Sequence, residues 1–168
     1  SLSIGMKYNG DNQIRQNIAE IMQAQLAAVG VDVTPLSVEY QTLLEQVTDP
    51  DRRDFDAVVL GFTNDFRMDD RDLFHSERLQ GPYAFTGMSH PRLDRLLDTL
   101  QIVVDRSDAR ELWSEYQQVL VREQPFTFIY FGDRLAGLRE ELRGVEMDVR
   151  GEWINVQEWW LASEARRE

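Results

Sequence analysis

A mixed, largely parallel β-sheet flanked by helices, an α/β fold, is predicted by three observations. Apolar residues follow strand-like and helix-like spacing in turn along residues 2–61. The chain has 168 residues, 42% of them apolar, which suffices for one domain with a core or for one lobe of a larger protein. A buried-strand pattern ends at Gly61-Phe62. Since strands joined through helices run parallel with right-handed crossovers, this alternation predicts a parallel sheet.

The first part of the chain is predicted to run strand, helix, strand, helix, strand. Its three strand-like segments are residues 2–8, 31–38 and 55–61. Its two helix-like segments are residues 14–29 and 43–47. Asp11 or Asn12 is the expected N-cap of the first helix, and Gly30 is expected to end it. Pro35 favours an edge or a bulge for the second strand.

The second part begins with a loop-rich region that extends to residue 90. Two helices are then predicted, over residues 91–104 and 107–123. Pro91 suits a first helical turn, and Ser107 is the expected cap of the second helix. A buried strand is predicted over residues 126–131, FTFIYF, because aromatic and β-branched residues favour strands.

The local signals weaken after Gly132. Residues 134–143 are compatible with a helix or a strand, and a strand is predicted over residues 145–149. Residues 153–161 form a terminal apolar segment with three tryptophans, which we expect to pack onto another surface. The last residues, SEARRE, are expected to fray.

Composition restricts the classes of function. The chain has 18 basic and 30 acidic residues and a formal net charge of −12, which repels phosphate backbones and argues against nucleic acid or an anionic membrane as partner. The charge is compatible with a cationic ligand, although solubility is the favoured explanation for the acidity. No cysteine is present, which excludes disulfides, thiolate nucleophiles and zinc–thiolate sites. No apolar run approaches the ~20 residues of a membrane span, and no signal-peptide pattern is seen.

No motif predicts catalysis or a metal site. In a calcium loop starting at Asp65, Asp70 and Ser76 stand where glycine and glutamate are needed, so the acids there fit a helix N-terminus better. His75 and His90 lie in separate loops, and hydrogen-bonded or solvent-facing roles are favoured for them. No pair of acids stands in a distinctive glycosidase context, and Gly-x-Ser-x-Gly, phosphate-binding glycine loops and His-Glu-x-x-His are absent. We therefore expect no enzyme activity, no catalytic residue, no metal and no cofactor.

The candidate ligand-binding residues come at the end of the third predicted strand: Gly61, Phe62, Asn64 and Asp65. In α/β sheets, ligands bind outside the carboxyl ends of the strands. An aromatic ring there can contact an apolar ligand body, and a carboxylate can pair with a cationic group, so binding is favoured over catalysis. From the residues alone, two alternatives stay open: Asp65 as a residue that caps a turn, and Phe62 as a core residue.

Four motifs in a shared order carry a resemblance to a known family. IRQNIAEIMQAQLAAVGVDVTPLSVEY is similar to its helix and Gly-Val/Ile-x-Val strand, and RRDFDAVVLGFTND to its strand ending in Gly-Trp-x-x-Asp. FTGMSHPRLDRLLDTL resembles its Gly-Tyr-Ser-Asn-Pro-x-x-Asp-x-Leu segment, and RSDARELWSEYQQVLVREQPFTFIYF its Asp-x-x-x-Arg-x-x-x-Tyr-x-x-x-Gln helix followed by Glu-x-Pro and a strand. Over roughly residues 1–150, the chain resembles the C-terminal lobe of the family 5 extracellular solute-binding proteins, the peptide-, dipeptide- and nickel-type receptors of bacterial ABC importers.

The resemblance implies one lobe of a periplasmic binding protein type II-like fold, with residues 1–161 as that C-terminal lobe and residues 162–168 as a tail. A missing N-terminal lobe of the same chain would close on the ligand with it, like a hinged clamp. In peptide-binding members the motif aspartate pairs with the ligand's α-ammonium group, and Asp65 holds that position here. Phe62 replaces the motif tryptophan and so lacks its indole N–H, while Met88 and His90 replace the motif tyrosine and asparagine.

The resemblance also implies a small solute or peptide as ligand, an ABC transporter permease as partner, and a periplasmic or extracellular location, with a lipid anchor as one arrangement in the full-length protein. The isolated lobe is expected to bind ligand weakly, because it supplies half of the contacts. Two other hypotheses stay open. One is a ligand-sensing lobe of a regulatory protein with the same fold, and the other is a hydrolase of unknown type, for which no motif is seen.

Overall fold

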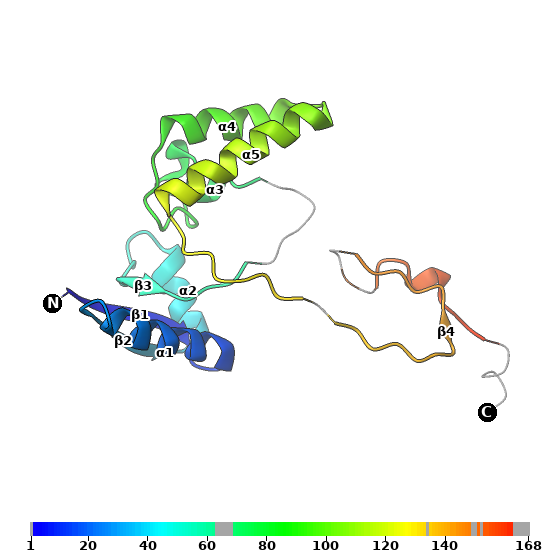
Figure 1. Ribbon diagram of the computed structural model, residues 1–168, viewed down its shortest axis with the longest axis horizontal. Coiled ribbons are helices and arrows are strands. Elements are labelled where there is room, and N and C mark those ends of the chain that lie inside the picture. Colours follow the sequence, from blue (N-terminus) through cyan, green and yellow to red (C-terminus); the bar gives the residue numbers. More distant parts are fainter. Residues whose placement is uncertain (1, 63–68, 134, 149–150, 152, 163–168) are drawn as a thin grey trace. The chain divides into compact units, whose positions relative to one another are not determined.

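The computed structural model describes residues 2–62, 69–133, 135–148, 151 and 153–162, which fall into two units. The described residues of the first unit are 2–62 and 69–126, and those of the second lie from residue 127 onward (Figure 1). None of the helices in the described ranges is long and apolar enough to cross a membrane.

A three-stranded parallel sheet forms the first part of the first unit. Its strands are β1 (Leu2–Asn9), β2 (Val31–Val38) and β3 (Ala57–Val58), in the order β2-β1-β3. Leu2 pairs with Val31, and the register continues to the end of both strands, while Met6 pairs with Ala57. Both pairings are parallel, which confirms the predicted parallel α/β sheet.

The strand β3 is shorter than the predicted residues 55–61. At its start, the Asp56 carboxylate takes the place of a backbone acceptor and receives the Gly5 N–H at 2.8 Å. At its end, the Val59 N–H still donates to the Lys7 carbonyl at 2.9 Å, and the chain then leaves the sheet. The strand therefore delivers Gly61 and Phe62 just beyond the sheet, as the sequence predicted.

Two helices connect the strands. They are α1 (Gln13–Ala27) and α2 (Tyr40–Thr48). Of the two predicted caps for α1, Asn12 is the one observed: its side chain accepts the Arg15 N–H at 3.0 Å. Gly30 follows the helix with φ +85°, a left-handed conformation that favours glycine and ends the helix as predicted. Glu39 caps α2 by accepting the Thr42 N–H at 2.9 Å.

The helix α1 packs on the sheet through a small apolar core. Its buried members come from β1, β2, α1 and the residue that follows β3: Met6, Tyr8, Ala19, Val33 and Val59. Leu43 and Val47 of α2 are also almost fully buried, at 1% exposure each. This core fixes the strand ends at which the candidate residues lie.

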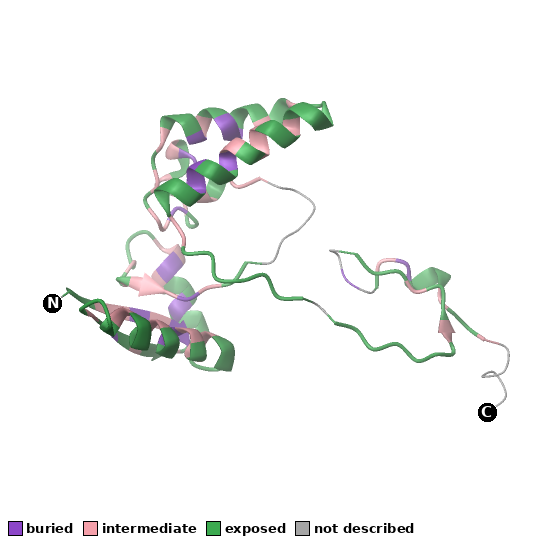
Figure 2. Cartoon of the chain, in the orientation of Figure 1, coloured by how far each residue is buried: buried purple, intermediate pink, exposed green. Residues whose placement is uncertain are grey.

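The second part of the first unit is helical. Its elements are α3 (Arg71–Phe74), the 3₁₀ turn η1 (Ser76–Arg78), α4 (Pro91–Ile102) and α5 (Arg106–Glu123). The helices α4 and α5 lie side by side, with buried positions along their facing sides (Figures 1 and 2). Their shared core consists of Phe74, Leu93, Leu96, Leu97, Tyr116, Val119 and Leu120. Both helices are thus confirmed within two residues of their predicted bounds.

Side chains just before each helix satisfy its first amides. His90 caps α4, since its Nδ1 accepts the Leu93 N–H at 3.3 Å. The predicted cap of α5, Ser107, is wrong: Asp105 accepts the Ser107 N–H at 2.8 Å, and Ser107 is already helical. An aspartate two residues earlier outcompetes the serine because a carboxylate is the stronger acceptor for amides at a helix N-terminus.

The second unit contains short elements: β4 (Leu142–Arg143), η2 (Val156–Glu158) and β5 (Trp160–Leu161), with β4 and β5 antiparallel. The buried strand predicted over residues 126–131 is wrong, because residues 127–131 form no strand and Phe131 is 86% exposed. Strand propensity is a weak local preference that the tertiary context overrides in this apolar segment. The strand predicted over residues 145–149 is also misplaced: β4 precedes it, and only Asp148 within it forms an isolated bridge among the described residues.

Asn155 organises the second unit, a role that its sequence context did not predict. It is 6% exposed and uses both ends of its amide. Its Nδ2 donates to the Gly144 carbonyl at 2.7 Å, and its Oδ1 accepts from the Glu146 N–H at 3.1 Å and from the Trp159 indole at 3.0 Å. These bonds satisfy a buried polar side chain that would otherwise be costly.

Candidate functional site

The parallel strands end at one edge of the sheet, at Asn9, Val38 and Val58, which we call the carboxyl edge. Asn9 is 5% exposed and accepts from Arg15 Nη1 at 2.7 Å. The other guanidinium nitrogen of Arg15 lies over Gly61, where a Cβ would stand 3.3 Å from it. Arg15 of α1 thus packs closely over Gly61, and a larger residue there would require the Arg15 side chain to shift by a few tenths of an ångström.

Phe62 lies next to this edge, in a group of aromatic rings. Its ring stacks on Phe85 with centroids 6.3 Å apart and an interplanar angle of 10°, and its centroid lies 5.8 Å from that of Phe126. We call these three residues, Phe62, Phe85 and Phe126, the aromatic wall. Phe62 is 55% exposed, so it is not an enclosed core residue. One side of its ring is packed, and the rest of its surface is exposed.

The inner side of the aromatic wall joins the helical core. Phe126 meets Phe74 edge to face at 5.2 Å, and Phe74 in turn lies 6.4 Å from Tyr116. The Tyr116 hydroxyl donates to Asp70, and burial together with this hydrogen bond raises the pKa of Tyr116 far above its ordinary value. The tyrosine therefore stays protonated and acts as a fixed donor behind the wall.

Two of the four predicted ligand-binding residues, Asn64 and Asp65, lie outside the described residues. The structure places the other two, Gly61 and Phe62, exposed at the carboxyl edge. The role of all four in ligand binding stays a prediction.

A shallow hollow of about 440 Å³ opens at the carboxyl ends of β1 and β2. Its lining residues are Gly10, Asp11, Ser37, Val38, Glu39 and Tyr40. Amide hydrogen bonds from Gln41 and Thr42 hold the pKa of Glu39 below its usual range, so this carboxylate is charged at neutral pH. The sequence analysis named Asp11 only as an alternative N-cap and did not predict a hollow here, although the place of these residues around the ends of two predicted strands was a usable signal.

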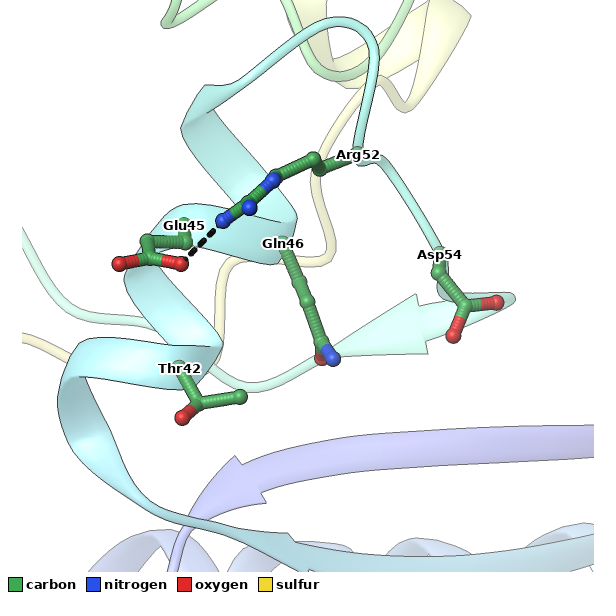
Figure 3. A pocket seen from close by; sticks show the side chains of 5 residues that line it. All are labelled: Thr42, Glu45, Gln46, Arg52 and Asp54. Atoms are coloured by element: carbon green, nitrogen blue, oxygen red, sulfur yellow. Dashed lines mark hydrogen bonds and ion pairs between the residues drawn. The ribbon is translucent and has the colours of Figure 1, made fainter.

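A second hollow of about 330 Å³ lies beside α2 (Figure 3). It is lined by Thr42, Glu45, Gln46, Arg52 and Asp54. Figure 3 shows Arg52 reaching toward Glu45, with which it pairs, and Asp54 pairs with Lys7 at 3.0 Å. Arg52 and Asp54 thus already pair with charged groups of the protein itself. We therefore do not assign a ligand to this hollow.

The two histidines are hydrogen-bonded, as the sequence favoured. His90 caps α4, and His75, 4% exposed, accepts the Glu77 N–H through Nδ1 at 3.2 Å and lies 3.4 Å from an oxygen of Asp98. Asp70 is the N-cap of α3 and Asp72 lies in its first turn, which matches the expected acidic helix start. In the part of the chain that the structure covers, no group of three or more His, Cys, Asp or Glu residues is arranged to hold a metal ion.

No protein-family model matches the chain. It is 29% identical over 160 residues to the oligopeptide-binding protein AppA of Bacillus subtilis, a match that covers 95% of this chain and 29% of AppA. It is 27% identical over 154 residues to the oligopeptide-binding protein OppA of the same organism, covering 89% of this chain and 27% of OppA. The chain therefore spans less than a third of the length of these relatives.

Solved structures give the same result. AppA of Bacillus subtilis in complex with a nonapeptide superposes with a TM-score of 0.80 at 29% identity, over 96% of this chain and 32% of AppA. NikZ of Campylobacter jejuni in complex with Ni(L-His) has a TM-score of 0.72 at 15% identity, over 94% of this chain and 33% of NikZ, and shows the fold alone.

These matches define the class first: the fold is that of the oligopeptide-binding protein AppA, and NikZ shares it. Within that class, the chain is homologous to the oligopeptide-binding proteins AppA and OppA over a fragment of their length. The resemblance to the family 5 solute-binding proteins is thereby confirmed, as is the predicted α/β fold. The relatives are binding proteins.

Proposed function

We propose that the chain is the ligand-binding C-terminal lobe of an ABC-importer solute receptor, with residues 1–161 as the lobe and residues 162–168 as its tail. It takes a peptide or a similar small solute, and an N-terminal lobe of the same polypeptide closes over it. The observation that carries this proposal is the half-exposed Phe62 at the carboxyl edge of a lobe that matches peptide-bound AppA over 96% of its length. Nothing in the relatives favours the alternative of a regulatory sensor.

Each candidate residue has a distinct role in this proposal. Asp65 pairs with the ligand's α-ammonium group, and a charge-assisted hydrogen bond in a closed cleft suits that task. Phe62 contacts an apolar part of the ligand, Gly61 leaves room for Arg15, and Asn64 supplies a polar contact beside the anchor. The acidic carboxyl edge, with Asp11 and Glu39, adds a field that favours a cationic ligand end.

The proposal includes no chemistry on the ligand. The receptor hands the solute to an ABC transporter permease, works in the periplasm or outside the cell with a lipid anchor in the full-length protein, and has no nucleic acid partner. The transporter context is supported by relatives whose names describe oligopeptide-binding proteins and an ABC transporter substrate-binding protein, and the lack of a nucleic acid partner by the net charge of −12. The lipid anchor is an expectation from the family resemblance.

Calorimetric titration of the full-length receptor with a nonapeptide tests the proposal. We expect a saturable 1:1 binding curve and, by mass spectrometry, an unchanged peptide after release. Phe62→Ala should weaken binding about tenfold, since it removes an aromatic contact of ~1.4 kcal/mol. The matched control is Ile21→Ala, because Ile21 on α1 is 54% exposed and should leave affinity unchanged. A cleaved peptide, or no binding of any peptide, would contradict the proposal.

A further inference from the structure

We infer that Arg53 is a positioning residue for the aromatic wall: it fixes the loop that carries Phe85 and, through Phe85, the ring of Phe62. This inference rests on the proposed function, because it assigns to Arg53 an indirect effect on ligand affinity. Arg53 lies in the segment between α2 and β3.

The guanidinium group of Arg53 binds three backbone carbonyls. Its Nε donates to the Val47 carbonyl at 3.2 Å, in the last turn of α2. Its Nη1 donates to the Ala84 carbonyl at 3.3 Å, and its Nη2 donates to the Gly81 carbonyl at 2.7 Å. A planar cation with several donors in fixed directions can serve all three carbonyls at once, which the single ammonium of a lysine cannot do in the same geometry.

The carbonyls that Arg53 binds lie in two segments that this cation can stabilise, the C-terminal end of α2 and an irregular loop. The carbonyls at the end of α2 carry the negative end of the helix dipole, which favours a cation there. Residues 79–90, by contrast, form neither helix nor strand. Their backbone bonds are local: Ala84 N–H donates to Gly81 at 3.4 Å, and Gly87 N–H donates to Ala84 at 3.2 Å. Arg53 therefore bonds to the carbonyls of two successive turns in the loop of residues 79–90. It connects this loop to α2, which lies more than 30 residues earlier in the chain.

Phe85 directly follows Ala84, whose carbonyl accepts the hydrogen bond from Arg53. Ala84 is only 3% exposed. The Phe85 ring forms the stacked partner of Phe62 and lies 5.9 Å from Phe126. A shift of the loop moves Phe85 and removes the support behind the half-exposed Phe62. Arg53 acts on the ligand surface in this way without touching the ligand.

Arg52 supplies a matched control one residue away. Its guanidinium is 62% exposed and pairs with Glu45 and Asp49, so Arg52→Met removes the same charge and the same chemical group without touching the loop. Arg53→Met removes the three carbonyl bonds, and Arg53→Lys keeps the charge but loses the planar fork.

The test uses amide hydrogen exchange and aromatic NMR signals of the 168-residue chain without ligand. In Arg53→Met we expect exchange of the loop amides 79–88 to rise about tenfold or more, with shifted ring signals of Phe62 and Phe85, while β1 and α1 amides keep their rates. The loop exchange rates of Arg53→Lys should lie between those of the wild type and Arg53→Met, and those of Arg52→Met should equal those of the wild type. Unchanged loop exchange in Arg53→Met, or an equal rise throughout the first unit, would overturn the inference.

A second arm measures nonapeptide affinity in the full-length receptor. Arg53→Met should weaken binding about tenfold, the equivalent of removing the Phe62 contact, and Arg52→Met should not. A loosened loop with unaltered affinity would also overturn the inference. Failure of the wild-type receptor to bind any peptide would instead overturn the proposed function, and the ligand-free exchange data distinguish that case.

Discussion

Single polar side chains hold several turns of this chain in place by bonding to backbone groups. Asp94 on α4 is an example, because its carboxylate accepts from both the Ser76 N–H at 3.0 Å and the Ser76 hydroxyl at 2.7 Å. Burial raises the pKa of Asp94, but these bonds and the nearby His75 and His90 outweigh burial and hold the pKa below its ordinary value. The carboxylate thus connects η1 to the first turn of α4 at neutral pH.

The lowered pKa of Asp94 predicts an acid-sensitive contribution to stability. A folded-state pKa below the unfolded value of about 3.9 stabilises the fold above that value, and the contribution is lost as the pH falls through the folded pKa. We therefore expect Asp94→Asn to lower the melting temperature at pH 6 and to converge with the wild type near pH 2. Melting temperatures measured between these pH values check this, with the exposed Asp51→Asn as control. A constant difference across the range would contradict the assignment.

At the scale of elements, the local spacing of apolar residues correctly predicted the longer helices and the order of strands and helices in the first unit. The apolar spacing of α1, α4 and α5 and the strand–helix alternation were sufficient, since each helix buries its own stripe against a neighbour in the first unit. The FTFIYF segment was mispredicted because strand propensity depends on context, and residues 127–131 form no strand despite their aromatic and β-branched composition. The cap of α5 was mispredicted because a serine and an aspartate compete for the same amides.

The candidate site was predictable only in part. The position of Gly61 and Phe62 just after the third strand was predicted because strand ends can be located from sequence, while their role in ligand binding stays a prediction. Arg53 and Phe85 were not identified, because their roles depend on a contact between segments about 30 residues apart that no local pattern encodes. The acidic hollow at Asp11 and Glu39 was missed for a related reason, since it combines the ends of two strands.

The α4–α5 pair should depend on its central leucines. Leu96 is 1% exposed in the shared helical core, so Leu96→Ala removes buried contacts and leaves a cavity, at a cost of about 2–5 kcal/mol in the free energy of unfolding. Ile102→Ala is the control, because Ile102 is on the same helix and 78% exposed. Urea denaturation followed by circular dichroism measures both, and equal losses would contradict the assigned core.

At the scale of the whole molecule, the chain corresponds to 29% of AppA and 27% of OppA. A clamp needs two lobes, so the polar groups of one lobe stay in water when the other is absent. We expect the 168-residue chain to bind a nonapeptide at least ~100-fold more weakly than the full-length receptor, a difference of ~2.7 kcal/mol. Calorimetry on both proteins gives the comparison. Tight binding by the chain alone would show that a second lobe is not required.

The most direct test of a receptor that holds its ligand by an ammonium anchor is a thermodynamic cycle at Asp65. The full-length receptor and its Asp65→Asn variant are titrated with a nonapeptide and with its N-acetylated form, and Asp51→Asn serves as control. We predict that either change alone weakens binding about 30-fold or more and that both together cost little beyond one, because both remove the same ion pair. If acetylation weakens the Asp65→Asn variant as much as the wild type, or if that variant binds with unaltered affinity, Asp65 is not the anchor and the proposed site is wrong.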